Sequence, residues 1–482
     1  MSSPSSRADA PDSGTAPIGS SSLGAGMKGR HLVMMSLGSA IGAGLFVGSG
    51  AGIHTAGPAV LLSYVIAGIV VIIMMRSLGE LSAAHPSSGA FSVYTSRALG
   101  PAAGFTVGWL WWLQLCLVIA AESTAAAQLL NGLWPVFPQW VLALVFMVAF
   151  TAVNMLGVGK FGEFEFWFSM IKVGAVVAFL IVGIVFLLGG TPTESPGLSN
   201  LTEHGGFFPM GLGGVAAGLL VVAFAFGGIE IVAVAAAETE DPEKNVGRAI
   251  RTIVWRILIF YMGSVAIMVL AMPWNDENLL ASPFVAVLNT AGLPAVASIM
   301  AVVVTVALLS SLNANLYGAS RMIFSLSHRS LAPAALSRTN PRGVPVAAVL
   351  ASVAFGFVTV GLNYLWAEEI LGILLNIVGS TLIVIWTMTI VSHLVLRRRA
   401  EREGRELVLR AWGYPALSYV ALAGMVAVVI LGMTVPGVRQ QILLTAGLFA
   451  LLWIIGAVLA KRRGVTRFRA PEEFDDPAAM PR

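Results

Sequence analysis

Runs of about 20 mostly apolar residues recur along this 482-residue sequence and constrain its fold more than any other feature. A run of that length crosses the hydrocarbon core of a bilayer as one α-helix, whereas a transmembrane β-barrel shows alternating polarity in segments of about ten residues. Charged residues make up only 11% of the chain, against about 25% in soluble proteins. The sequence therefore predicts an all-α integral membrane protein.

The number of runs predicts about twelve transmembrane helices. Amphipathic segments are expected between spans, at residues 77–102 and 274–293. The spans centre on residues 32–54, 57–76, 103–131, 139–157, 164–189, 211–237, 252–272, 294–320, 344–362, 369–395, 414–433 and 440–460.

The basic residues indicate how the chain is oriented. Of the 28 Lys and Arg residues, only Arg439 and Lys172 fall outside the inner loops and tails of this arrangement. The positive-inside rule then places both termini in the cytoplasm, as expected for a multi-pass protein of the cell (inner) membrane. The same distribution explains the net charge of +4 without a nucleic-acid partner. Residues 1–27 are predicted to be a disordered cytoplasmic tail without a signal peptide, and residues 464–482 a C-terminal cytoplasmic tail.

The cysteine and histidine content argues against redox, metal and enzyme chemistry. The single cysteine, Cys116, lies in an apolar run, so an intrachain disulfide and a multi-thiolate metal site are excluded. No metal site is expected, because ligand spacing is missing between the histidines His31, His85, His328 and His393. An integral enzyme would be expected to cluster His, Asp or Cys at a membrane face, so the chain is predicted not to be an enzyme.

The first apolar run is too rich in glycine to form an unbroken helix. Five glycines, Gly38, Gly42, Gly44, Gly48 and Gly50, lie within residues 36–50. A helix inside a membrane is opened only where protein or a water-filled cavity satisfies the freed backbone groups, so such a break indicates a binding site. The alternative is that these glycines only allow close helix packing, as Gly-x-x-x-Gly motifs do.

A second interruption lies in the sixth run, at residues 224–230, five helices after the first. Since five is odd, a second copy of a five-helix unit would start on the opposite face of the membrane and run inverted. Corresponding interrupted helices in two halves point to a transporter's substrate site. We assign residues 28–200 to the first repeat (helices 1–5), 201–396 to the second (helices 6–10) and 397–463 to helices 11 and 12.

Two broken helices together suit a zwitterion. The N-terminal end of a half-helix offers free N–H groups and a positive dipole to a carboxylate, and the facing half-helix offers carbonyls to an ammonium. The predicted N–H donors are Gly42, Ala43 and Gly44. The predicted carbonyl acceptors lie near Ser39, Ala40, Ala225 and Phe226.

Three charged residues lie at membrane depth, where each costs about 2.5–3.5 kcal/mol to insert. Lys172, in the fifth span, is predicted to be a proton-binding site, and the alternative is an ammonium that snorkels to the inner interface. Glu230 is predicted to hydrogen-bond between half-helices or to act as a protonatable gate partner. Glu122, in the third span, either takes part in proton coupling or serves as a structural partner of a hydroxyl or backbone group.

The uncharged neighbours of the breaks would then determine selectivity. Phe224 and Phe226 are positioned to close over a ligand, although aromatic residues in membrane proteins often only pack. Gly227 and residues of the third and eighth helices would contact the substrate side chain. The polar residues Asn313, Asn315 and Tyr317 of the eighth helix are more typical of interhelical hydrogen bonding than of ligand contact.

A series of short motifs occurs in order along residues 28–460. They are Ser39-Ala-Ile-Gly-Ala-Gly-Leu-Phe46, Gly57-Pro58 followed by Gly79-Glu80 and Pro86, Glu163-Phe-Glu-Phe-Trp-Phe168 leading to Lys172, Phe226-Gly-Gly-Ile-Glu230, Glu238-Thr-Glu-Asp-Pro242 and Ser320-Arg-Met322. In these motifs the sequence resembles the bacterial amino acid permeases of the amino acid-polyamine-organocation superfamily.

The resemblance implies a LeuT-like fold, with a 5+5 inverted repeat plus two C-terminal helices and alternating access around the first and sixth helices. It also implies that Lys172 takes the place of a sodium ion beside the first break and that Phe224 is an outer gate. Two positions depart from the family pattern: Ala43 replaces a common threonine, and Gly247 replaces a common proline.

The sequence therefore predicts a secondary active transporter that imports an amino acid, neutral or a similar zwitterion such as γ-aminobutyrate (GABA), by proton symport. No cofactor is expected beyond the proton gradient, and the expected partners are the substrate, protons and the lipid bilayer. The alternatives are an amino acid exchanger, a cationic amino acid permease and, from another class, an amino acid sensor that does not transport.

Overall fold

The computed structural model describes residues 41–85, 87, 89–155, 158–231, 257–367, 370–405, 407 and 409–462. Within these ranges every regular element is helical. Several features of interest in the sequence lie outside the described residues, namely Ser39, Ala40, the 238–242 motif and Gly247.

The helices fall into two length classes. The longer ones are α3 (Val60–Ala84), α5 (Pro101–Leu133), α6 (Gln139–Asn154), α7 (Val158–Leu187), α9 (Gly211–Ala225), α15 (Pro294–His328), α16 (Val346–Leu365), α17 (Ile370–Arg402), α18 (Ala416–Gly432) and α19 (Pro436–Arg462). The shorter ones are η1 (Gly44–Gly48), α2 (Ser49–Ala56), η2 (Gly57–Ala59), α4 (Ala90–Leu99), α8 (Ser199–Thr202), η4 (Ile257–Met262), α12 (Gly263–Ala271), α13 (Asn278–Ala281), α14 (Pro283–Thr290) and η5 (Ala334–Ser337).

Each of the twelve predicted apolar runs coincides with helix in the described part of the chain. Seven stretches are long and apolar enough to cross a membrane, and four further apolar helices are shorter. One of the seven, Gly44–Ala84, contains two predicted spans, because Gly57 adopts a non-helical φ of 65° between α2 and α3. The expected segments between spans contain the helices α4, α13 and α14. The all-helical membrane fold is confirmed, while the inverted repeat and the count of twelve crossings stay predictions.

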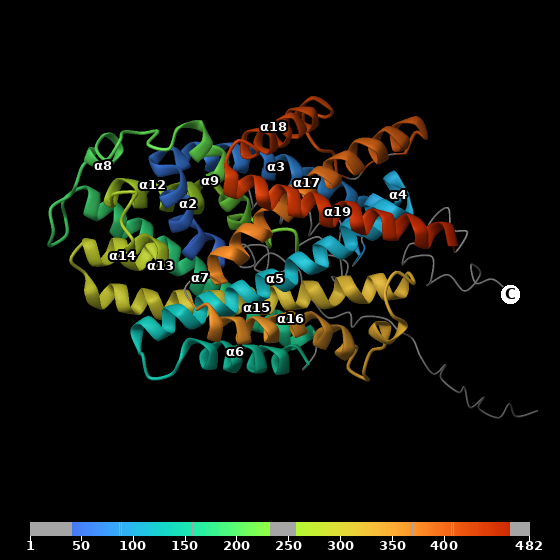
Figure 1. The fold of residues 1–482 in the computed structure, drawn as a ribbon, viewed down its shortest axis with the longest axis horizontal. Helices are drawn as coiled ribbons and strands as arrows, with labels where there is room; N and C mark the ends of the chain where they lie inside the picture. Colours follow the sequence, from blue (N-terminus) through green and yellow to red (C-terminus); the bar gives the residue numbers. More distant parts are fainter. Residues whose placement is uncertain are drawn as a thin grey trace, which may run out of the picture.

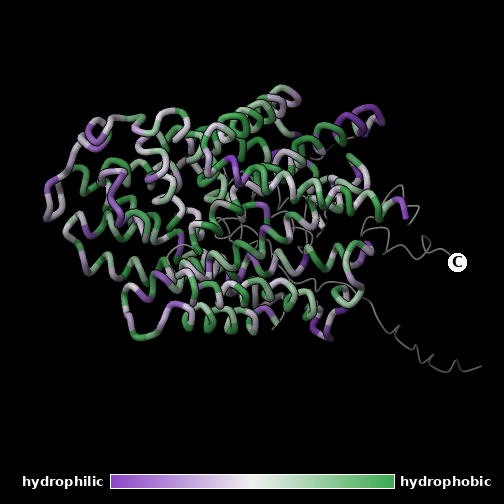
Figure 2. Tube along the Cα trace, in the orientation of Figure 1, coloured by the Kyte–Doolittle hydropathy of each residue, from purple (hydrophilic) through white to green (hydrophobic). Residues whose placement is uncertain are grey.

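The surface of the helix bundle is apolar along its length and polar at its ends. The long helices run broadly along one axis, with α8, α13 and α14 at one end and α4 and the end of α19 at the other (Figure 1). Hydrophilic residues concentrate in the loops and helix termini, and hydrophobic residues cover the helices between them (Figure 2). Large apolar side chains such as Ile181, Ile299 and Ile454 are more than half exposed. This pattern suits a protein whose solvent is lipid.

The segments that contain the two predicted breaks lie against each other in the interior. The short helices η1 and α2 pack against α9, and α9 packs against α17. A side chain at Gly379 of α17 would overlap the carbonyl oxygen of Leu220 in α9. This close approach of two helix backbones fixes the distance between α9 and α17.

Replacing Gly379 with alanine is expected to push α9 away from α17 and to lower the melting temperature of the detergent-purified protein. Overpacking of this kind costs about 1–3 kcal/mol. Gly372 of the same helix is the matched control, because nothing lies within 4 Å of its missing side chain. Gly372→Ala is expected to leave the melting temperature unchanged or raise it. Equal melting temperatures for the two variants would contradict this packing.

Candidate functional site

The described chain begins within the first predicted break. Ile41 and Gly42 have bent backbone, and helical geometry starts at Ala43. The next residues form a π-helical turn, in which the amides of Leu45 and Phe46 both donate to the carbonyl of Gly42, at 3.1 and 3.0 Å. The segment is thus the N-terminal end of a half-helix, where amide groups lack partners in their own helix.

At two positions of the first break the surrounding atoms leave no room for a side chain, so only glycine fits. A side chain at Gly42 would overlap Glu122 Oε1 and Ser311 Oγ, and one at Gly44 would overlap the backbone of Ala225. The first and second breaks therefore meet backbone to backbone at Gly44 and Ala225. Close packing, the alternative interpretation of these glycines, is thus part of the geometry and brings the two breaks together.

The second break follows the end of α9 at Ala225. The amide of Gly227 donates to the carbonyl of Phe224 at 2.9 Å, which closes a turn instead of continuing the helix. Gly228 then adopts a φ of 93°, a conformation that glycine tolerates and other residues avoid. The chain is interrupted at the predicted place, as far as Ile231, where this described range ends.

Glu230 ties the second break to α17. Its Oε2 accepts the Gly228 amide at 2.8 Å, and its Oε1 accepts the indole N–H of Trp386 at 2.7 Å. The side chain is buried. Both carboxyl oxygens thus accept from donors that do not titrate, which favours a structural role over a gate that gains and loses a proton. Trp386 is a partner that sequence reasoning missed.

Glu122 of α5 caps the half-helix of the first break. Its two carboxyl oxygens each accept the Ala43 amide at 3.1 Å, and Oε1 also accepts the Ser311 hydroxyl at 2.8 Å. The amide that the sequence assigns to a substrate carboxylate is therefore bonded, in this structure, to a carboxylate of the protein. Sequence reasoning missed Ser311, because its relation to Glu122 depends on the packing of α15 against α5.

Lys172 of α7 is fully buried and paired with a carboxylate that sequence reasoning did not single out. Its Nζ lies 3.7 Å from Oε1 of Glu165, which is also fully buried. The hydroxyl of Ser310 donates to both Glu165 oxygens, at 3.1 and 3.0 Å. The seven-residue spacing of Glu165 and Lys172 places both on one face of a helix, and this spacing was the available signal.

The aromatic and amide residues near the breaks are buried as well. The ring of Phe224 faces Gly48, and Phe226 packs against Tyr64 and Tyr261 with ring centroids 5.8 and 4.9 Å away. Asn313 accepts a hydrogen bond from Asn154 of α6 at 2.7 Å. This bond fits the expected role of Asn313 in interhelical bonding.

Gln114 of α5 is a further residue that sequence reasoning missed. Its side chain is 1% exposed, and neither its oxygen nor its nitrogen has a hydrogen-bond partner in the described part of the protein. The amide nitrogen would lie 3.9 Å from a side chain at Gly227. A buried amide without a partner costs about 1–3 kcal/mol, so its place beside the second break makes it a candidate contact for the substrate.

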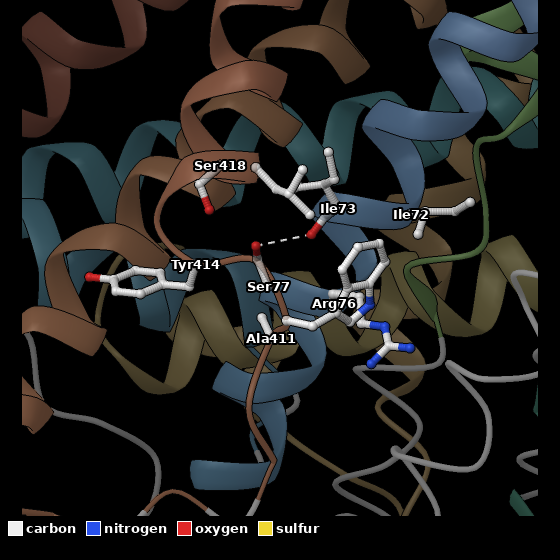
Figure 3. Close-up of a pocket in the computed structure, with 9 residues that line it drawn as sticks. Ile72, Ile73, Arg76, Ser77, Ala411, Tyr414 and Ser418 are labelled. Atoms are coloured by element: carbon white, nitrogen blue, oxygen red, sulfur yellow. Dashed lines mark hydrogen bonds between the residues drawn. The ribbon is translucent and has the colours of Figure 1, made fainter.

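Two surface pockets lie apart from the contact between the breaks. Figure 3 shows the first, between the end of α3 and the start of α18, where the Ser77 hydroxyl donates to the Ile73 carbonyl at 3.0 Å. The second lies beside Trp386 among α3, α9, α17 and α18, and its lining offers no charged side chain. Neither pocket contains Ala43, Glu122 or Lys172, so the candidate site is the buried contact of the breaks.

Comparison with known proteins identifies the family. The model of the amino acid permease family matches residues 31–466. The chain belongs to the amino acid permease family. It is 43% identical over 439 residues to the γ-aminobutyric acid permease of Bacillus subtilis, covering 91% of this chain and 94% of the relative.

Two further relatives are similar to this chain, and one of them is named for a different substrate. The aromatic amino acid transport protein AroP of Corynebacterium glutamicum is 46% identical over 416 residues, covering 85% of this chain and 90% of the relative. The γ-aminobutyric acid permease of Escherichia coli is 40% identical over 431 residues, covering 89% and 92%. The chain is therefore a multi-pass membrane protein of a family of amino acid transporters, and the resemblance seen in the sequence is confirmed.

Gly44→Ala is expected to separate the two breaks and to reduce amino acid uptake in reconstituted vesicles by about tenfold or more, since 1.4 kcal/mol already gives that factor. The added methyl would overlap backbone, which cannot move aside as a side chain can. Gly52→Ala is the control, because the nearest atom to its new side chain is 3.4 Å away. Wild-type uptake by Gly44→Ala would refute the requirement for this contact.

Proposed function

We propose that this protein imports an amino acid together with protons, by alternating access around the two breaks. The proposed architecture is two inverted five-helix repeats followed by two helices, with both termini in the cytoplasm. The observation that carries the proposal is the hydrogen bond between the Ala43 amide and the Glu122 carboxylate. Family membership supports amino acid transport, and this bond supports the coupling to protons.

The bond suggests how substrate and proton binding depend on each other. A substrate carboxylate that approaches the half-helix end would compete with Glu122 for the Ala43 amide. Two carboxylates at one buried amide repel each other, and the repulsion is large away from water. Protonation of Glu122 removes its negative charge and frees the amide. The substrate and a proton would therefore bind best together, which is the requirement for symport.

The environment of Lys172 supports the same mechanism. A buried ammonium in a membrane helix requires a partner, and Glu165 supplies one at 3.7 Å. This contact argues against the alternative that Lys172 snorkels to the inner interface. We propose that Lys172 keeps a positive charge beside the first break and responds to the protonation of the carboxylates around it.

Lys172→Ala is expected to abolish accumulation of substrate driven by an inward proton gradient in proteoliposomes. The reason is that the variant removes the buried positive charge that is proposed to respond to protonation of the carboxylates around it. Lys461→Ala, at the exposed end of α19, is the control and is expected to accumulate normally. Gradient-driven uptake that is unchanged in Lys172→Ala would rule out this role.

The same assay separates the alternatives. A wild-type protein that only exchanges internal for external substrate would be an exchanger. One that binds amino acids but never moves them would be a sensor.

The contacts of the site favour a neutral, polar zwitterion as the substrate. Glu230 has both oxygens engaged by Gly228 and Trp386, so it offers no open carboxylate to a cationic side chain. The unpartnered amide of Gln114 beside Gly227 favours a substrate with a hydrogen-bonding group at its far end. We propose GABA, or a neutral amino acid with a polar side chain, in preference to an aromatic amino acid.

Gln114→Leu is expected to lower uptake of GABA relative to phenylalanine. A site built to hydrogen-bond a polar group discriminates strongly against analogues that lack it, so the uptake ratio should shift by about tenfold or more. Gln128→Leu, at a half-buried position of the same helix, is the matched control and should leave the ratio unchanged. Competition between labelled GABA and phenylalanine measures the ratio, and an unaltered ratio in Gln114→Leu would remove Gln114 from the substrate contacts.

A further inference from the structure

We propose that Glu165 is a second proton-binding carboxylate, paired with Lys172, and that the adjacent residues Ser310 and Ser311 hold Glu165 and the Glu122 of the first break in one proton-binding cluster. This inference rests on the proposed proton symport and extends it, because it assigns the proton to a cluster of groups instead of one residue. The cluster comprises Glu122, Glu165, Lys172, Ser310 and Ser311 and is called the proton cluster below.

The geometry of Glu165 is that of a built site. The carboxylate is fully buried, lies 3.7 Å from the Lys172 ammonium and accepts the Ser310 hydroxyl at both oxygens. Ser169, one helical turn away on α7, lies at 3.5 Å from Oε1. Removing one partner of a buried ion pair leaves an uncompensated charge, so the two residues depend on each other.

The charges of the proton cluster do not cancel. When all three groups are ionised, two carboxylates face one ammonium. Among the described residues, Lys172 is the one charged group that acts electrostatically on Glu122 or Glu165 from any helix packed against them. A net negative charge in a buried site at membrane depth is costly. One proton, bound at either carboxylate, makes the cluster neutral.

Two adjacent serines of α15 hydrogen-bond to the two carboxylates, one serine to each. Ser310 and Ser311 follow each other on α15, so their side chains point in directions about 100° apart. Ser310 therefore reaches Glu165 on α7, while Ser311 reaches Glu122 on α5 at 2.8 Å. A hydroxyl donates one hydrogen and also accepts, so it can bond either to a carboxylate or to a carboxylic acid.

This arrangement relates substrate binding at the Ala43 amide to proton binding by the proton cluster. Substrate at the Ala43 amide favours a proton on Glu122, and the Ser311 hydroxyl can then accept that proton's hydrogen bond. Loss of the proton to the inner solution returns Glu122 to its ionised form and restores its bond to Ala43. While it is ionised, Glu165 pairs with the Lys172 ammonium, and in the proton-loaded cluster it is the alternative site for the proton that Glu122 otherwise holds. The step adds H⁺ to a carboxylate oxygen or removes it, and no other covalent bond is made or broken.

The pairing is tested first, by a double-mutant cycle on the purified full chain. Lys172→Met and Glu165→Gln should each lower the melting temperature, because each leaves one buried charge or amide without its partner. The double variant should melt above the less stable single variant. Purely additive losses would show that Glu165 and Lys172 do not act as a pair and would overturn the proposal.

The proton role is tested next, in proteoliposomes with labelled GABA as the probe. Glu165→Gln should retain GABA exchange but lose accumulation driven by a proton gradient by about tenfold, the effect of a change of 1.4 kcal/mol. Glu165→Asp, which keeps a titrating carboxyl, should recover part of the accumulation and shift its pH profile. Ser310→Ala should weaken accumulation. Thr305→Ala should not, because that buried hydroxyl of α15 donates within its own helix, to the Ala301 carbonyl, and has no other hydrogen bond among the described residues.

The outcomes separate the two proposals. Wild-type protein that exchanges GABA but never accumulates it would overturn the proposed symport itself. Accumulation by wild-type protein that survives in Glu165→Gln would leave symport intact and overturn the role of Glu165. Failure of Glu165→Asp to recover any accumulation would assign Glu165 a structural role only, which also contradicts the proposal.

Discussion

The hydrogen bond from the Ala43 amide to Glu122 is the interaction on which the rest of the site depends. A helix that starts inside a membrane leaves amide groups that lipid cannot satisfy. Here a carboxylate from α5 reaches one of them, and it can do so because Gly42 has no side chain to block the approach. Helix α15 also lies close to Glu122, because the Ser311 hydroxyl donates to the same Oε1 that accepts the Ala43 amide. The break, Gly42 and the long helices α5 and α15 thus meet at one backbone amide.

Most of the fold could be predicted from the sequence, because the length and apolarity of a membrane helix are local properties. The predicted run at 139–157 corresponds to α6 at Gln139–Asn154. The predicted helix boundaries were wrong where a helix continues beyond its apolar part. The run at 294–320 belongs to α15, which extends to His328 through the polar but buried Ser325 and Ser327. Hydropathy reports contact with lipid, and these serines are buried by protein instead.

The site could be predicted only in part, for a related reason. Lys172, Glu122 and Glu230 stand out in the sequence, because a charge within an apolar run is costly wherever the chain folds. Their partners depend on contacts between residues far apart in the chain: Trp386 lies 156 positions from Glu230, and Ser311 lies 189 from Glu122. Glu165 lies closer to its partner but sits at the start of its apolar run, where a carboxylate is typical of a helix end. Its burial follows from the packing of α15 on α7.

Glu122, Glu165 and Glu230, the buried carboxylates discussed above, differ in the chemistry of their partners, and this difference separates structural from exchangeable groups. Glu230 accepts from a backbone amide and an indole, neither of which can accept a proton in return. Glu122 and Glu165 each accept from a serine hydroxyl of α15, which serves as donor or acceptor. A proton added to Glu230 meets no acceptor among these two partners, whereas a proton added to Glu122 or Glu165 can be donated to a serine hydroxyl that reverses its direction. On the proposed mechanism, the energy of the proton gradient is therefore used at the carboxylates that face the adjacent serines of α15, and Glu230 keeps the second break in shape throughout the cycle.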